Sequence, residues 1–224
     1  MPTLTVAGSA VVRGRVTVPR VGPWHAEVRL DADVPPSGAV ALSWGDGAAT
    51  WRGFIVPGRA GAYTTGGPSQ VRVVGGAGGL SREVDGASYR STTPRVVLGQ
   101  ILSAVGERLS GTSPAATLDR SLARWSRAAG PAGAQVDRLA RTLGVPWRVL
   151  PDGSVYFGPE VAGTLDLGAQ GSVTRRLPAD ALVQVATDTP WTLTVGLTLD
   201  GVRVEQIVHH LGPDRIQSDL WRAA

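Results

Sequence analysis

The strongest constraint on the fold is a period of two in the first third of the chain. In the stretch WHAEVRLDADV, residues 24–34, apolar and polar side chains alternate. Because successive side chains of a strand point to opposite faces, this pattern predicts a half-buried antiparallel strand. The inward face would carry Trp24, Ala26, Val28, Leu30 and Ala32, and the outward face His25, Glu27, Arg29, Asp31 and Asp33.

Turn signals separate this strand from other short β-prone runs. PPSG leads into AVALSW, GDG leads into AATWRGFIVPG, and QVRVVGG follows a glycine-rich loop. Short strands with turns about every eight to twelve residues are typical of a small barrel or sandwich. We therefore expect residues 1–84 to form a first β domain.

The middle of the chain, residues 85–160, changes period. In STTPRVVLGQILSAVGERL, Thr93 and Pro94 suit the N-cap and first position of a helix. Its apolar residues recur every three or four positions, at Val97, Leu98, Ile101, Leu102, Val105 and Leu109. A second helix is predicted from Pro131 to Gly144, with Val136, Leu139, Ala140 and Leu143 on one side. Pro151-Asp152-Gly153 then predicts a hairpin, so this segment is α+β.

From residue 161 to 224 the pattern returns to strands. ALVQVAT, TLTVGLTLDGVRVEQIVHHLG and RIQSDLWRA contain alternating runs, and Asp200-Gly201 is a candidate tight turn. The predicted fold class is thus mainly β, with an α+β insert between two β domains.

The stretch VRVVGGAGGLSREV, residues 71–84, raises the question of a phosphate-binding loop. Gly76 and Gly78 could begin a G-x-G-x-x-G motif, but its sixth position is Ser81 and no G-K-[ST] follows. Neither a helical period nor a lysine comes next, whereas such loops hold the anion at a helix N-terminus. We expect a bulge or tight turn in which glycine serves backbone geometry, and no nucleotide or other cofactor.

Candidate catalytic and metal-binding residues are few. The chain has no cysteine and three histidines, His25, His209 and His210. His209 and His210 would point to opposite faces of a strand, which disfavours a shared metal ion. Asp31 and Asp33 share a predicted strand face, but two exposed acids near a turn are typical of a solvated surface. No G-x-S-x-G occurs, so we predict no catalytic, cofactor-binding or metal residues and no enzyme activity.

Charge and aromatic content leave other binding functions open. The net charge is +4 and every basic residue is an arginine, spread singly along the predicted strands, which favours solvated strand faces over a nucleic-acid site. Among the seven tryptophans, Trp24 and Trp147 lie in strand patterns and are expected in the core, whereas Trp191 and Trp221 are candidates for subunit contacts. The opening residues do not resemble a signal peptide, and no apolar run approaches membrane-spanning length, so we expect no membrane insertion.

The order of these signals resembles a known family. A β module ends in RVVGGAGGLSREVDGASYRSTTPRVVLGQIL, an insert contains LARWSRAAGPAGAQVDRLARTLGVPWRVLPDGSVYFG, and the chain closes with GLTLDGVRVEQIVHHLGPDRIQSDLW. This order is similar to that of the baseplate hub proteins of contractile-tailed phages, the late control protein D-like proteins. It is also similar to the related N-terminal hub part of type VI secretion spike proteins.

The resemblance implies a structural role in the virion. Each chain would contribute two small antiparallel, tube-like β-barrel domains flanking a helix-containing domain, and a homotrimer would form a pseudo-sixfold ring. The implied partners are the tail tube protein or tube initiator, the central spike protein, the tape measure protein and other baseplate proteins. DNA would pass through the channel only in transit. Assembly would take place in the bacterial host cytoplasm.

Two other functions fit parts of the sequence. A tail-associated carbohydrate-binding or cell-wall hydrolase module would place tryptophans along a groove and, for hydrolysis, two carboxylates across it. A nucleic-acid-binding barrel has the basic net charge as its only support.

Overall fold

A closed β-barrel occupies the first third of the chain. The computed structural model describes residues 4–57, 61–62, 69–160, 162–167, 171–212 and 215–223. The strands of this part are β1 (Leu4–Val6), β2 (Ser9–Pro19), β3 (His25–Leu30), β4 (Ala39–Trp44), β5 (Ala49–Ile55), β6 (Gly61–Ala62) and β7 (Ser69–Gly75), with a short 3-10 helix, η1 (Gly45–Gly47), between β4 and β5. They pair antiparallel in the order β1-β4-β5-β7-β3-β2, and β1 also pairs with β2, which closes a six-stranded ring.

The alternation that predicts β3 is seen in its burial. Trp24, Ala26, Val28 and Leu30 are buried, and the residues between them are partly exposed. The predicted length is wrong, because β3 ends at Leu30. Asp31 and Asp33 therefore follow the strand as exposed loop residues and do not share a strand face.

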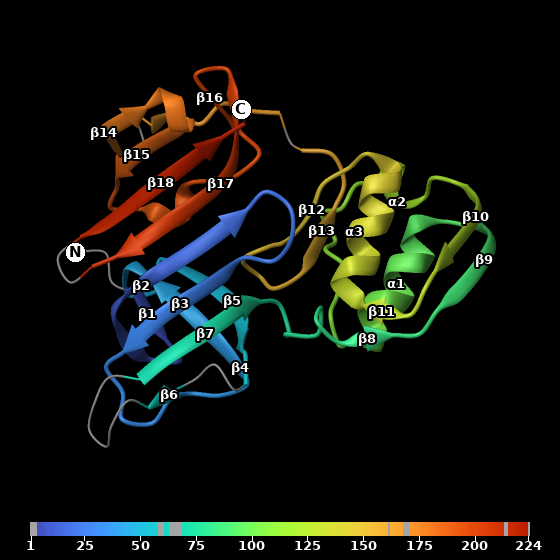
Figure 1. Ribbon diagram of the computed structural model, residues 1–224, viewed down its shortest axis with the longest axis horizontal. Coiled ribbons are helices and arrows are strands. Elements are labelled where there is room, and N and C mark those ends of the chain that lie inside the picture. Colours follow the sequence, from blue (N-terminus) through green and yellow to red (C-terminus); the bar gives the residue numbers. More distant parts are fainter. Residues whose placement is uncertain are drawn as a thin grey trace.

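The insert consists of small β-pairs and helices. Its elements are β8 (Glu83–Val84), β9 (Ala87–Thr92), α1 (Pro94–Ala104), α2 (Ala115–Leu118), β10 (Leu122–Arg127), β11 (Gly130–Pro131), α3 (Ala132–Leu143), β12 (Trp147–Val149) and β13 (Val155–Phe157). The pairs β9–β10, β8–β11 and β12–β13 are antiparallel. In Figure 1 the β9–β10 ribbon lies at the end of the insert that is far from the barrel, with the helices between.

Both predicted helices form, with two ends corrected: α3 starts at Ala132, and Pro131, the predicted first residue, is its N-cap. Pro94 is the first residue of α1, and Gly144 ends α3 in the left-handed conformation, as predicted. The prediction that this helix continues to Leu109 is wrong, because α1 ends at Ala104 and Gly106 has a φ of 77°. Leu109 instead forms an isolated β-bridge with Val155.

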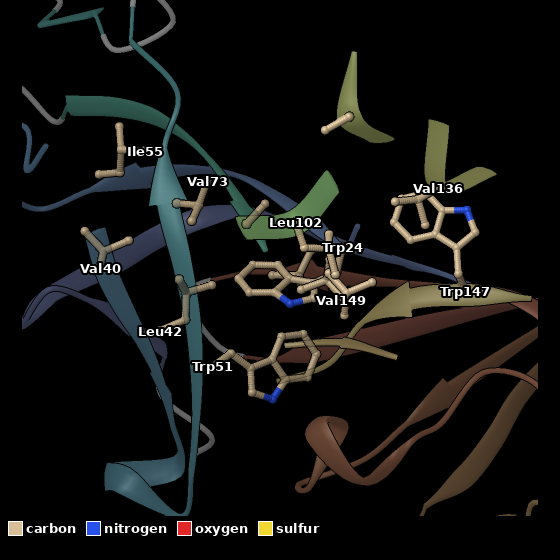
Figure 2. Packing of buried hydrophobic residues seen from close by; sticks show 14 of the residues in the cluster. Trp24, Val40, Leu42, Trp51, Ile55, Val73, Leu102, Val136, Trp147 and Val149 are labelled. Atoms are coloured by element: carbon tan, nitrogen blue, oxygen red, sulfur yellow. The ribbon is translucent and has the colours of Figure 1, made fainter. Parts of the chain in front are cut away.

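The barrel and the insert share one hydrophobic core. Trp24, Leu42, Trp51 and Val73 from the barrel belong to the same buried cluster as residues of α1, α3 and β12. Figure 2 shows Trp24 and Trp51 in the part of this cluster that also contains Leu102 and Val149. The insert is therefore packed against the barrel and not merely tethered to it.

The last part of the chain extends the barrel sheet. Its elements are β14 (Ser172–Leu177), β15 (Leu182–Ala186), β16 (Thr198–Leu199), β17 (Val202–Leu211) and β18 (Ile216–Arg222), with short 3-10 helices η2 (Pro178–Asp180) and η3 (Pro190–Thr192). Asp200 and Gly201 form the predicted turn, both with positive φ. These strands pair in the order β17-β18-β15-β14 over a second buried cluster.

Strand β2 joins the two β parts. One of its sides pairs with β3, and the other pairs first with β1 and then with β17, where Thr17 lies opposite Val208. Figure 1 shows β2 and β17 as neighbouring antiparallel strands. The predicted fold class is confirmed: the protein is mainly β, with a closed antiparallel barrel and a helix-containing insert.

Candidate functional site

The glycine-rich loop after β7 binds an anionic group, and this group is a side chain of the protein itself. The carboxylate of Glu107 accepts hydrogen bonds from the backbone N–H of Ala77 (3.0 and 3.1 Å to its two oxygens) and from the N–H of Gly79 (2.8 Å). Glu107 is only 6% exposed. Successive backbone N–H groups in such a turn form a concave anion site, which here is filled by a side chain of the segment that follows α1.

The glycines of this loop are required by the close approach of that segment. Gly76 and Gly78 have φ values of 88° and 75°, a region that side chains disfavour. A Cβ on Gly79 would lie 2.1 Å from the carbonyl oxygen of Val105. The expectation that these glycines serve backbone geometry therefore has a physical basis at each position, and the loop is a connection between the barrel and the insert.

The two adjacent histidines have opposite surroundings. His209 is fully buried, and its Nδ1 lies 2.8 Å from Ser218 Oγ. His210 is exposed, with its Nε2 3.0 Å from a carboxylate oxygen of Asp219. Burial, and secondarily the neighbouring His210, lowers the pKa of His209 to about 3. His209 is therefore neutral at physiological pH, and its ring lies edge-on to Trp44 at 5.6 Å between centroids.

In the part of the chain that the structure describes, the candidate metal-binding residues do not come together. Among the described residues, no group of three or more histidine, aspartate or glutamate side chains is placed to hold a metal ion. The sequence-based prediction of no catalytic residue stays a prediction, because it concerns an absence.

The tryptophans pack inside the chain to different extents. Trp24 and Trp147 are buried in the core, as predicted. The ring of Trp44 contacts those of Trp51 and Trp191 in tilted geometries, with centroids 5.4 and 6.3 Å apart, which joins the barrel to the last β part. Trp221, on β18, is 38% exposed. The predicted subunit contacts of Trp191 and Trp221 stay predictions.

A partly buried ion-pair network lies where the three parts of the chain meet. Glu160 has a side chain only 12% exposed and lies 2.7 Å from Nη1 of Arg148 in β12 and 3.6 Å from Nη1 of Arg20, which follows β2. Arg20 also donates a hydrogen bond to Glu205 of β17 at 2.6 Å. Because buried charges need partners, these residues fix the barrel, the insert and β17 relative to one another.

Sequence reasoning missed both Glu107 and this network. The partners lie far apart in the sequence, and Arg20 and Glu205 are separated by 185 positions. The only local signal for Glu107 is a single acid directly after Gly106, at the end of a helix.

Solved structures with a similar fold cover almost the whole chain. A 43 kDa tail protein of prophage MuSo2 from Shewanella oneidensis matches with a TM-score of 0.68 at 8% identity, over 99% of this chain and 98% of that one. An E. coli component of the type VI secretion system, described as structurally similar to the phage T4 tail proteins gp27 and gp5, matches with a TM-score of 0.66 at 14% identity, over 99% and 77%. A tail protein from Neisseria meningitidis MC58 matches with a TM-score of 0.63 at 13% identity, over 99% and 96%.

These structures show that the chain has the fold of phage-tail and type VI secretion proteins. No family model and no curated protein matches the sequence. Within the described residues, none of the helices has the length and apolar character needed to span a bilayer.

Proposed function

We propose that this protein is a structural hub component of a phage or phage-like contractile tail and not an enzyme. The observation that carries the proposal is the fold: three tail or secretion proteins match 99% of the chain with TM-scores from 0.63 to 0.68. Assembly of a tail depends on the shapes of its proteins and on the interfaces between them. A chain whose buried polar residues stabilise its own fold is consistent with such a role.

The proposed assembly is a homotrimer that forms a pseudo-sixfold ring. The proposed domains are 1–84, 85–160 and 161–224, with the first and last as the two tube-like modules of each chain. A chain with two similar modules can mimic two subunits of a hexamer, so three chains can match a sixfold tube and a threefold spike. The pairing of β2 with β17 supports this proposal, since it holds the two β parts in a fixed relation.

The proposed partners follow from that position in the tail. They are the tail tube protein or tube initiator, the central spike protein, the tape measure protein and other baseplate proteins. DNA passes through the channel without being held. The protein would be assembled in the host cytoplasm and then remain in the virion baseplate.

The alternative carbohydrate-binding or cell-wall hydrolase function is not favoured by the tryptophans. It requires aromatic rings along an open groove, but Trp24, Trp44, Trp51 and Trp147 are buried in the core. Asp31 and Asp33 also follow each other in one loop and do not face each other across a groove.

The test is the copy number of the protein in purified tails, measured by native mass spectrometry of extracted baseplates and by averaged particle images. Three copies around an open channel are expected. Six copies in a ring, or a monomer bound to the outside of the tail, would contradict the proposal.

A pair of variants tests the assembly more sharply. Trp221→Glu should reduce ring formation if this exposed side chain lies in a subunit contact, because a charge would be buried there. Val34→Glu is the matched control, since Val34 is 80% exposed in a loop. Val34→Glu should keep the melting temperature of the wild-type monomer. Trp221→Glu should lower it, because Trp221 is only 38% exposed, so circular dichroism of the monomer has to show that this variant is folded.

A further inference from the structure

The β9–β10 ribbon carries an uncompensated pair of arginines. Arg90 of β9 lies directly opposite Arg124 of β10 in the antiparallel register, and both side chains are exposed. Like charges directly across a sheet destabilise it. Within the described part of the chain, neither guanidinium has a carboxylate partner, whereas Arg95 nearby is paired with Asp119 at 2.7 Å. This pair therefore contributes no stability to the isolated chain.

A hollow lies next to this pair. Its volume is about 340 Å³, and it is lined by Ser88, Tyr89, Arg90, Arg124, Trp125, Ser126 and Arg138. No acidic residue is among the lining residues. By strand alternation and register, Arg90, Arg124, Ser88 and Ser126 share one face of the ribbon. These two guanidinium groups and two hydroxyl groups form a site for an anionic group, because charged hydrogen bonds from guanidinium to carboxylate are among the strongest in proteins.

The aromatic rings of the ribbon, on the face opposite Arg90 and Arg124, are already covered. Arg138 lies over the ring of Trp125 with its guanidinium carbon 5.7 Å from the centroid, and Arg127 lies over Tyr89 at 5.9 Å. Single-stranded nucleic acids are held largely by stacking of bases on free aromatic rings. A guanidinium stacked on a ring keeps its in-plane N–H groups free for a carboxylate, so the geometry favours a protein acid over a base.

The ribbon also offers backbone groups to a partner. β9 and β10 form a sheet of only two strands, so in the described structure each strand has an outer edge without a paired strand. An extended segment can add to such an edge through main-chain hydrogen bonds, while alternate side chains reach one face. Carboxylates at positions i and i+2 of that segment would then lie on the face of Arg90 and Arg124.

We propose that the β9–β10 ribbon binds an extended acidic segment of a partner protein, with carboxylates at alternate positions. The ribbon lies at the end of the insert remote from β14–β18 (Figure 1), so this contact is separate from the proposed ring of β modules. The inference does not depend on that ring, and its test uses the isolated chain.

The experiment measures fluorescence anisotropy with a labelled short peptide of alternating Thr and Glu. Saturable binding is expected, and the same peptide with Gln in place of Glu should not bind. The double variant Arg90→Gln/Arg124→Gln should weaken binding by about tenfold or more, because it removes both facing charges. The matched control Arg175→Gln/Arg203→Gln removes two exposed charges from β14 and β17 and should bind as the wild type does.

Each other outcome overturns the inference. Equal weakening in the two double variants would mean that the peptide responds only to net charge. Tighter binding of an oligothymidylate that is lost in the ribbon variant would assign the site to nucleic acid. Self-association of the chain that is lost in the ribbon variant, seen by sedimentation velocity, would assign it to a second copy. Absence of peptide binding to a correctly folded wild-type protein would also refute it.

Discussion

Acidification should destabilise this protein through His209. The ring is fully buried, and its Nε2 has no hydrogen-bond partner within the described residues. Burial and the nearby His210 lower its pKa from an ordinary value of 6.5 to about 3. Between these two values the unfolded chain binds a proton at this position and the folded chain does not, so the free energy of unfolding must fall as the pH falls.

The expected magnitude follows from the separation of the two pKa values. Each pH unit between them changes the free energy of unfolding by about 1.4 kcal/mol. The loss should begin near pH 6.5 and reach about 2 kcal/mol at pH 5. The contribution of His209 should become constant below about pH 3, where both states are protonated.

Urea unfolding at pH 7.5 and pH 5.0, followed by circular dichroism, measures this difference. His209→Gln should be less stable than the wild type at pH 7.5, because it disturbs the contact with Ser218, but should lose about 2 kcal/mol less on acidification. His210→Gln, at the exposed neighbouring position, should keep most of the wild-type pH dependence. An equal loss in His209→Gln and the wild type would refute the assignment to His209.

Three other results are expected. Glu107→Ala should lower the free energy of unfolding by on the order of 3 kcal/mol, because the loop N–H groups lose their acceptor, and Glu107→Gln should lower it less. Equal urea midpoints for the wild type and the two variants would contradict this. Gly153→Val should lower the free energy of unfolding by about 1 kcal/mol or more, because φ is 80° and a Cβ would lie 3.2 Å from Arg52 Cβ. Gly111 has open space around it, so Gly111→Val should change the melting temperature less. ATP, GTP and NAD should give no saturable thermal shift, since the anion site is already filled by Glu107; micromolar binding abolished by Gly78→Val would argue against that reasoning.

Local patterns predicted the elements whose causes are local. The alternation around Val28, the Pro94 start and the Gly144 end all depend on the backbone geometry of a few neighbouring residues. The same logic failed at Leu109, because an apolar residue at the right spacing was buried by a contact with Val155 after the helix had ended. β10 gave no clear hydrophobic period, because each of its faces mixes apolar and polar residues: Leu122 shares a face with Arg124, and Trp125 shares the other with Arg127.

The candidate sites were hard to predict because they depend on tertiary contacts. The sequence correctly raised the question of an anion at Gly76–Gly79, but nothing local shows that the anion is Glu107, 28 positions after Gly79. The arginine pair of the ribbon likewise depends on the register that places Arg90 opposite Arg124. A single sequence gives the residue types, and the pairing of distant segments decides what they do.

The position of β2 between the two β parts has a consequence for synthesis on the ribosome. β2 emerges early, but the strand that covers its second half, β17, is translated much later. Until then the nascent chain exposes main-chain donors and acceptors from Gly14 to Pro19, and a free strand edge invites pairing with the wrong chain. The strands that pair to complete this sheet lie far apart in the sequence, and such long-range contacts slow folding. Production of this protein should therefore benefit from chaperones that shield nascent strands.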